Sequence, residues 1–189
     1  LINPGPQGSE RPTGQQAAFI ELVDLKTEGD TLSGSLVVQS QTGHKLPTSF
    51  PSRRVWLHIT VKDASGQVVF ESGAANPDGS IQGNANDADP SAYEPHYQTL
   101  SNPEQVQIYE AILGNTDGAV TTTLLRAASY LKDNRVLPAG FDLEKASPDI
   151  APQREAAQDG DFIAGGDTLL LAIPLNGAQG PFTVEAELL

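Results

Sequence analysis

The clearest alternation of apolar and polar residues along the chain runs from Val55 to Lys62. A period of two is typical of a half-buried β-strand, in which one set of side chains faces the core and the other faces solvent. A turn over 63–66 and an apolar return over 67–70 then predict a β-hairpin, with Gly66 at the positive φ of the turn. The set that would face the core comprises Val55, Leu57, Ile59 and Val61.

Several other segments have strand-like patterns. Residues 31–39 and 181–189 alternate, whereas 168–175 is the continuous apolar run expected of a buried strand. Residues 105–113 also alternate, and 119–132 joins a β-rich first half to a second half that could form a helical turn. About seven to nine strands with little helix predict an all-β fold, an antiparallel β-sandwich of the jelly-roll or Ig-like kind with long irregular loops.

The N-terminal part of the chain differs in composition. Residues 1–16 are rich in Pro and Gly, so we expect an extended arm there and one β-sandwich domain over 17–189. The arm would lie against its own domain or in a groove of a neighbouring copy. The strand predicted over 17–26, for which a helix is the alternative, has apolar residues on both faces, as a central or donated strand would. Its candidate assembly residues are Phe19, Ile20, Leu22, Val23 and Leu25.

The charge balance and the missing residue types narrow the classes of function. The chain has 24 acidic and 11 basic residues and a net charge of −13, which disfavours nucleic acid and anionic membranes and permits cation binding. It has no Cys, so it can form no disulfide, no thiolate metal site and no covalent c-type haem, which needs C-x-x-C-H. No apolar run reaches the roughly 18 residues of a membrane-spanning helix.

The long irregular segment 73–95, here called the acidic loop, is the strongest candidate for a metal site. Its Asp and Asn side chains offer the hard oxygen ligands that Ca²⁺ takes, although the pattern lacks the Gly and Glu of an EF-hand. The alternative is a solvated loop whose side chains bond to its own backbone. Calcium is the candidate cofactor, and its candidate ligands are Asn76, Asp78, Asn84, Asn86, Asp87, Asp89 and Glu94.

Histidines and paired arginines offer two further kinds of site. The three histidines could ligate a transition metal or an external haem, or they could be structural. Arg53 and Arg54 could bind an anion or a partner, but a structural clamp is favoured, in which arginine pairs with carboxylates of the acidic loop and stacks on an aromatic ring. The candidates for ligand or clamp are His44, Arg53, Arg54, Trp56 and His96, and His58 lies within the predicted strand.

Catalysis has little support in the sequence. The chain has no G-x-S-x-G motif, and so many acidic residues carry no information about a glycosidase carboxylate pair. Exposed aromatic residues on a β-sandwich could instead bind carbohydrate. We predict that the protein is not an enzyme.

Four stretches carry a resemblance to a known family. They are GHKLPTSFPSRRVWLHITVKDASGQVVFESG, NPDGSIQGNANDADPSAYEPHY, QVQIYE and YLKDNRVLPAGF, which lie between positions 43 and 141. Over this region the chain resembles the β-rich C-terminal, non-haem part of secreted multihaem c-type cytochrome-like proteins. The resemblance implies an exported bacterial or archaeal protein and a β-sandwich. Since the chain has no C-x-x-C-H, electron transfer is not carried over.

Two predictions of function follow from these patterns. The first is a structural protein, extracellular or on the cell surface, that assembles with other copies of itself into a filament or surface array by exchange of its N-terminal arm or strand. The second is a calcium-stabilised module that binds carbohydrate or a haem-bearing electron-transfer partner. The Pro- and Gly-rich arm, the strand with two apolar faces and the missing haem motifs favour the first.

Overall fold

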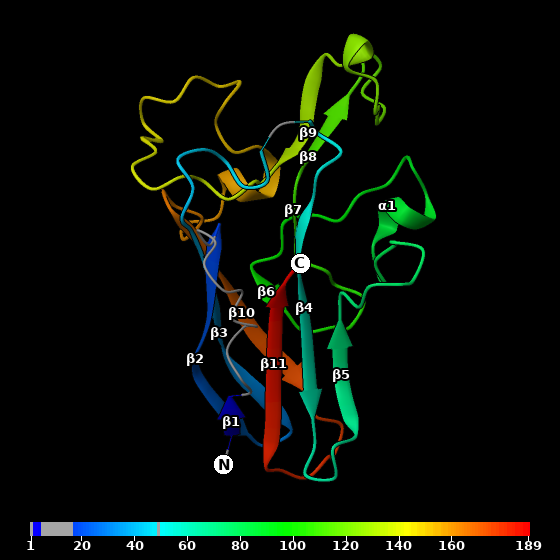
Figure 1. Ribbon diagram of the computed structural model, residues 1–189, viewed down its shortest axis with the longest axis vertical. Helices are drawn as coiled ribbons and strands as arrows, with labels where there is room; N and C mark the ends of the chain where they lie inside the picture. The colour runs from blue at the N-terminus through cyan, green and yellow to red at the C-terminus, as the bar shows by residue number, and fades with distance from the viewer. Residues whose placement is uncertain (1, 5–16, 49) are drawn as a thin grey trace.

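A computed structural model describes residues 2–4, 17–48 and 50–189, and its regular structure is mostly β-strand (Figure 1). The first sheet has the order β1-β11-β4-β5, and the short strand β7 pairs with the beginning of β4. Strands β11, β4 and β5 are antiparallel neighbours, whereas β1 runs parallel to β11. The bounds are β1 Ile2–Pro4, β4 Val55–Lys62, β5 Val68–Ser72, β7 Ile108–Tyr109 and β11 Phe182–Leu188.

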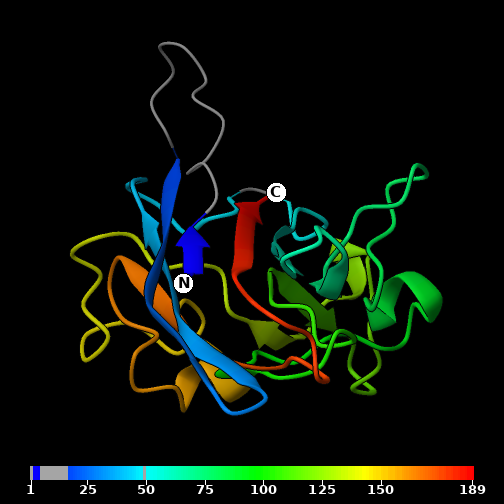
Figure 2. The ribbon, with the colours of Figure 1, turned by 90° about the horizontal axis from the view of Figure 1, so that it is seen from below.

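The second sheet has the order β2-β3-β10-β6. Strand β3 is antiparallel to both β2 and β10, and β6 runs parallel to β10. Seen from below, β2, β3 and β10 form one layer beside the layer that contains β11 (Figure 2). The prediction of an all-β sandwich with little helix is confirmed. The bounds are β2 Ala18–Glu28, β3 Thr31–Ser40, β6 Thr99–Leu100 and β10 Gly166–Pro174.

A hairpin of β8 Ala111–Gly114 and β9 Ser129–Asp133 projects from one end of the sandwich (Figure 1). Helix in the described residues is limited to three short pieces, of which none is long and apolar enough to cross a membrane. They are α1 Ala85–Ala88, η1 Leu124–Arg126 and η2 Arg154–Ala157.

Apolar side chains from both sheets fill the space between them. Leu36 of β3 and Leu169 of β10 are fully buried, as are Val61 of β4 and Val184 of β11. Burial of an aliphatic side chain of this size contributes about 1.5–3 kcal/mol to folding. The hairpin of β4 and β5 is the one predicted from the alternation, and Gly66 has the expected positive φ of 82°.

The strand predicted over 17–26 forms as β2, but the expectation that both its faces are buried is wrong. Phe19 is 48% exposed, while Leu22 and Leu25 both pack against the core. These two residues are three apart, so a regular strand would put them on opposite faces. A register shift at Asp24, which has a φ of 52°, turns Leu25 to the same face as Leu22.

Other predicted strands also differ from the structure. Residues 105–113 do not form one strand, because the chain leaves β4 as its partner after β7 and pairs with β9 from β8 onward. Residues 119–132 contain η1 and most of β9. The apolar run 168–175 lies in β10 except for its last residue, but Leu170 is 47% exposed because only one face of this strand packs against the core.

Candidate functional site

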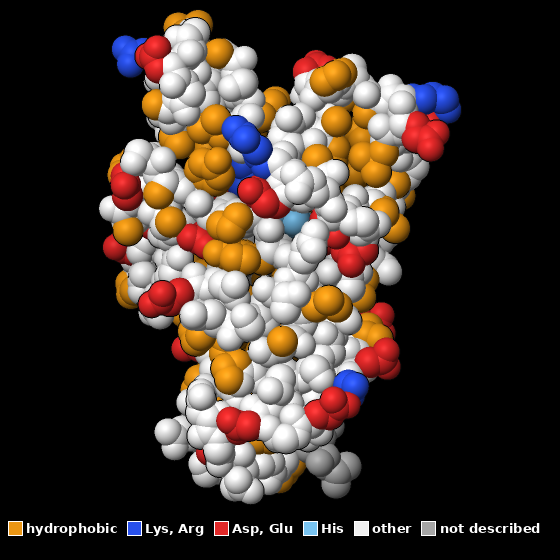
Figure 3. Space-filling view, turned by 180° about the vertical axis from the view of Figure 1, so that it is seen from behind, with side chains coloured by type: hydrophobic (Ala, Val, Ile, Leu, Met, Phe, Trp, Pro, Cys, Tyr) orange, Lys and Arg blue, Asp and Glu red, His pale blue; other side chains and the backbone are white. Residues whose placement is uncertain are grey.

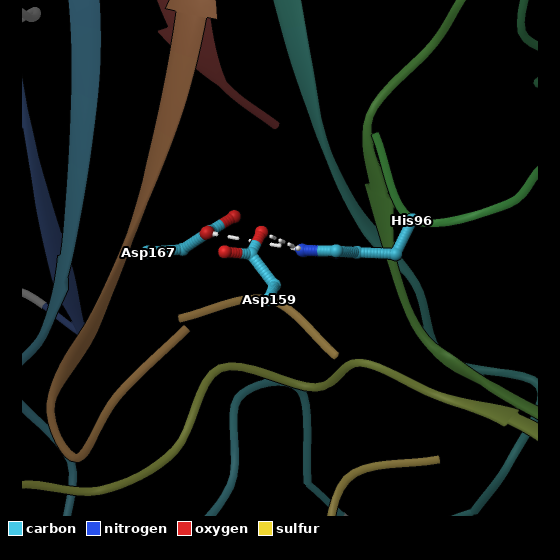
Figure 4. Close-up of side chains that lie close together, drawn as sticks. All are labelled: His96, Asp159 and Asp167. Carbon is cyan, nitrogen blue, oxygen red and sulfur yellow. Dashed lines mark hydrogen bonds and ion pairs between the residues drawn. The ribbon is translucent and has the colours of Figure 1, made fainter. Parts of the chain in front are cut away.

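Three polar side chains from distant parts of the chain meet in the interior (Figure 4). His96 lies in the loop that leads to β6, Asp159 follows η2, and Asp167 is the second residue of β10. His96 Nε2 is 3.1 Å from Asp159 Oδ2 and 3.9 Å from Asp167 Oδ1. All three side chains point toward one another and are less than 5% exposed. We call these residues the His–Asp–Asp cluster.

The local structure of β10 explains how Asp167 comes to be buried. Side chains of a strand alternate between its faces, so Asp167 shares the buried face with Leu169 and Leu171. The preceding residue, Gly166, lies so close to β3 that a Cβ there would be 2.7 Å from the Val38 carbonyl oxygen. This close approach requires glycine and holds the beginning of β10 against β3.

Hydrogen bonds around His96 determine which ring nitrogen carries the proton. Nδ1 accepts from Gln107 Nε2 at 2.9 Å and from Asn134 Nδ2 at 3.1 Å. A nitrogen that accepts hydrogen bonds carries no proton, so the network assigns the proton to Nε2. His96 is then neutral and donates this N–H to Asp159 Oδ2.

The two amides that face His96 are held in orientation by the backbone. Gln107 Oε1 accepts from the Tyr97 backbone N–H at 2.9 Å. Asn134 Oδ1 accepts from the Glu110 backbone N–H at 2.9 Å, and its Nδ2 also donates to the Ile108 carbonyl at 2.8 Å. A flip of either amide would place N–H against N–H, so both must present their NH₂ group to His96.

The two oxygens of Asp167 have different surroundings. Oδ2 accepts from the Tyr109 hydroxyl at 2.7 Å and from Gln107 Nε2 at 3.2 Å. Oδ1 is buried and has no hydrogen-bond partner among the described residues. Burial raises the pKa of the Asp167 carboxyl, and burial likewise raises the pKa of the Tyr109 hydroxyl well above its usual value. Asp167 thus has one oxygen that accepts two hydrogen bonds and one that accepts none from the described residues.

Asp161 adds a third carboxylate on the exposed side of the cluster. Its backbone N–H donates to Asp159 Oδ1 at 3.1 Å. Burial, followed by the charges of Asp159 and Asp167, raises the pKa of the Asp161 carboxyl. This collection of carboxylates could hold a shared proton or a cation, and the ligand atoms of His96, Asp159 and Asp167 all lie within 4.8 Å of one another.

The acidic loop, where calcium was predicted, has a different arrangement. Asp78 Oδ1 accepts from both the backbone N–H and the hydroxyl of Ser80, and Asp89 Oδ1 does the same with Ser91. Asn76 Nδ2 donates to the Ser80 hydroxyl at 2.8 Å. These contacts are those of a loop whose side chains bond to its own backbone, the alternative weighed for this segment.

Other polar atoms of the loop have partners as well, but the buried Asn84 Nδ2 has none among the described residues. Asn84 Oδ1 accepts from the Asn86 backbone N–H at the beginning of α1. Glu94 is only 6% exposed, and its carboxylate accepts from the Ala85 backbone N–H and from the Tyr97 hydroxyl. In the described part of the chain, three or more His, Asp or Glu ligand atoms converge only in the His–Asp–Asp cluster. Calcium at the acidic loop stays a prediction.

The clamp candidates connect β4 to the acidic loop. Arg54 Nη1 pairs with Asp87 Oδ1 at 2.7 Å, and its Nη2 donates to the Gly79 carbonyl at 3.1 Å. The other oxygen of Asp87 accepts from the Ile81 backbone N–H at 2.8 Å. Trp56 Nε1 donates to the Gly73 carbonyl at 2.9 Å, at the point where the loop begins.

The other candidates lie apart from this clamp. His44 is exposed with its ring beside the Lys45 carbonyl, and His58 lies between Glu71 and Glu187 on the outer face of the first sheet. The structure therefore does not bring His44 or His58 to His96. Arg53 donates its backbone N–H to the Phe50 carbonyl. Among the described residues, the arginine that stacks on an aromatic ring is Arg135, which lies over Tyr130.

The candidate assembly residues all lie on β2. Ile20, Leu22 and Leu25 pack against the core of their own chain, Val23 is half-buried, and only Phe19 is largely exposed. Strand β2 pairs with β3 and β1 pairs with β11, both within one chain. Most of the predicted arm, residues 5–16, lies outside the described residues.

Sequence reasoning found His96 but missed both of its acidic partners. Asp159 lies in a polar Ala-rich stretch that resembles a surface excursion, so nothing local distinguishes it. Asp167 did carry a signal. The run of alternate residues Leu169, Leu171 and Ile173 extends backward to Asp167, which places a carboxylate on the core face of the strand.

The comparisons with known proteins bear on the fold. No protein-family model and no curated protein matches the chain. Among solved structures, the chain is similar to the crystal structure of a penta-heme cytochrome c552 from Thermochromatium tepidum, with a TM-score of 0.51 and 18% sequence identity. The alignment covers 92% of this chain and 31% of the cytochrome chain. At this identity the likeness shows the fold alone, and it is weakly consistent with the cytochrome-like resemblance of the sequence.

Proposed function

We propose that the chain is a non-enzymatic β-sandwich module, exported from the cell, that binds a haem-bearing electron-transfer protein or protein region. The observation that carries this proposal is the structural likeness, because nearly the whole chain aligns with about a third of a protein named as a penta-heme cytochrome. This chain has no Cys to which haem could be attached covalently, so the haem would belong to the partner.

Two lobes at one end of the molecule offer a contact surface. One is the tip of the β8–β9 hairpin, where Leu124 is 51% and Leu125 is 98% exposed. The other is the loop 139–160, where Leu143 and Ile150 are 42% and 48% exposed. Apolar side chains appear on both lobes, which stand on either side of a notch (Figure 3). Exposed apolar residues that gather in this way favour contact with another protein.

The charge of the chain supports a partner of opposite sign. A net charge of −13 raises the encounter rate with a basic surface and lowers it with an acidic one. Association with the haem-bearing partner should therefore weaken as the salt concentration rises, because ions screen charges over about 10 Å at 0.1 M.

Sedimentation monitored at the haem absorbance band tests the proposal, since this chain itself does not absorb there. The probes are purified soluble multihaem c-type cytochromes, including the penta-heme cytochrome c552. We expect the sedimentation coefficient of at least one of them to rise when the chain is added, and the double variant Leu124→Ser, Leu125→Ser to abolish the rise. Val68→Ser is the matched control, because Val68 is 44% exposed and is the first residue of β5, which begins at the end of the sandwich away from the β8–β9 hairpin (Figure 1).

Different outcomes would reject different parts of the proposal. Equal binding by the leucine double variant and by the wild type would exclude the lobes as the contact surface. If no multihaem cytochrome bound the wild-type chain at any salt concentration, the proposed function itself would be contradicted.

Self-assembly is the second candidate, and one observation favours it. Among the described strands, β2 lies at the edge of its sheet, and an edge strand can accept a strand from another chain. The exposed Phe19 sits on this edge strand. Light scattering tests this candidate, with an oligomer in the wild type and a monomer in Phe19→Lys as the expected result. A monomeric wild-type chain would contradict it.

A further inference from the structure

One oxygen of the buried Asp167 carboxylate has, among the described residues, no hydrogen-bond partner of the kind that buried carboxylates normally have. Its side chain is 1% exposed, and Oδ1 accepts no hydrogen bond from any described residue. Buried polar atoms in proteins are almost always hydrogen-bonded, and buried charges are paired or coordinate a metal. The unpartnered oxygen points toward Asp159 and His96, so the missing partner would lie inside the cluster (Figure 4).

The side chains nearby do not supply a positive charge. Lys132, which is fully buried, pairs with Glu110 at 3.0 Å. Lys45 and Arg135 both pair with Asp133, each at 2.7 Å. In the described part of the chain, His96 is the only basic side chain within 4.0 Å of a cluster carboxylate, and its Nε2–H is directed to Asp159 Oδ2 at 3.1 Å, with Asp167 Oδ1 at 3.9 Å.

We propose that a divalent cation binds between Asp159 and Asp167 through carboxylate oxygens. Asp167 Oδ1 is the ligand from β10, and Asp159 is the ligand from the loop after η2. Asp161 approaches from the exposed side, where water can complete the coordination shell. An all-oxygen set of this kind suits hard cations such as Mg²⁺, Mn²⁺ and Ca²⁺.

His96 belongs to the outer shell of this site. A histidine that ligates a metal through Nε2 normally carries its proton on Nδ1 and donates it to an acceptor. Here Nδ1 faces two amide N–H donors, so ligation through Nε2 would bring N–H groups against one another. Donation from Nε2–H to Asp159 instead orients the carboxylate that holds the cation.

The position of the site indicates what the cation would do for the fold. Asp159 and Asp161 lie on an irregular segment that joins η2 to β10, whereas Asp167 belongs to the second sheet and His96 to the loop before β6. A cation shared by these elements would fasten the irregular segment to the sandwich. Because it binds the folded chain and not the unfolded one, it would raise the temperature of unfolding.

Thermal unfolding of the full chain after removal of metals by a chelator tests the proposal, with Mg²⁺, Mn²⁺ or Ca²⁺ added alone. We expect a saturable rise in the unfolding temperature at concentrations up to about 1 mM for at least one cation. Asp161→Asn should weaken the apparent affinity by about tenfold or more without loss of folding, because this residue is exposed. Asp149→Asn is the matched control, since Asp149 is an exposed carboxylate that lies before η2 and accepts a hydrogen bond from the Ser147 hydroxyl.

Three results would overturn the proposal. One is the absence of any saturable cation effect in the wild type, which would leave a shared proton as the partner of Asp167. Another is an effect that persists in both Asp161→Asn and Asp167→Asn but disappears in Asp78→Asn, which would move the cation to the acidic loop. The third is strong ¹⁴N coupling from a directly bound imidazole in the electron spin-echo spectrum of bound Mn²⁺. None of these outcomes depends on whether the chain binds a haem protein.

Discussion

The acidic loop and the His–Asp–Asp cluster are both rich in carboxylates, but the two regions use them differently. In the loop, Asp78 and Asp89 each bond to a nearby serine, and Asp87 pairs with Arg54. In the cluster, one oxygen of the buried Asp167 accepts no hydrogen bond from the part of the chain that the structure describes. An acidic residue in a turn can accept hydrogen bonds from the backbone of its own loop, whereas a buried carboxylate depends on the partners that the fold brings to it.

The largest effect that separates the two regions should come from Asn134→Ala. This side chain is fully buried, and its loss would leave the Glu110 backbone N–H without its acceptor and would remove one of the two amide donors to His96 Nδ1, the other being Gln107. We expect the free energy of unfolding to fall by about 1–3 kcal/mol, which is the usual cost of an unsatisfied buried group. Urea denaturation of the variant and the wild type measures this difference in the free energy of unfolding.

The matched control for this prediction is Asn102→Ala. Asn102 is exposed, and its side-chain oxygen accepts from the Glu104 backbone N–H in a turn. Its loss should cost clearly less than that of Asn134. Equal losses in the two variants would show that the network around His96 adds nothing beyond a surface turn.

A smaller effect is expected from Asp87→Asn in the acidic loop. The change removes the charge that pairs with Arg54, and both side chains are about one-fifth exposed. Partly exposed ion pairs are screened by water, so we expect a loss of about 1 kcal/mol that shrinks in high salt. A double-mutant cycle with Arg54→Gln measures the coupling between the two residues. A coupling near zero would mean that the clamp does not hold the loop.

The last prediction concerns the tautomer of His96 and needs no mutation. Long-range ¹H–¹⁵N correlation spectra of the metal-free chain should give a protonated Nε2 and an unprotonated Nδ1 near neutral pH, because both amides donate to Nδ1. A protonated Nδ1 would contradict the amide orientations and would allow His96 to act as a direct metal ligand.

Much of the fold could be predicted from the sequence because local patterns of apolar and polar residues determine where its strands and turns form. The alternation from Val55 to Lys62 and the turn with Gly66 predicted the β4–β5 hairpin. The sequence did not indicate which residues of β2 face the core. The register shift at Asp24 depends on a positive φ at that residue, which the neighbouring sequence does not predict. The split between β7 and β8 was missed for a similar reason, since it reflects a change of partner strand and not a change of pattern.

The candidate site depends on contacts that sequence patterns do not carry. His96 and Asp159 are 63 positions apart, and only the packed fold brings them within 3.1 Å. The density of Asp and Asn in the acidic loop drew the metal prediction there, although short turns satisfy such residues locally. The one local indication of the site was the position of Asp167 on the buried face of β10, where a carboxylate is rarely found without a partner.

The most direct test of the cation proposal is a crystal structure of the chain soaked with Mn²⁺, with data collected where manganese scatters anomalously. We expect an anomalous peak about 2.0–2.6 Å from Asp167 Oδ1 and from an oxygen of Asp159, the range of hard cation–oxygen distances, with none in the acidic loop. A peak bound to His96 Nε2, a peak at Asp78 or Asp89, or no peak at all at a saturating Mn²⁺ concentration would contradict it.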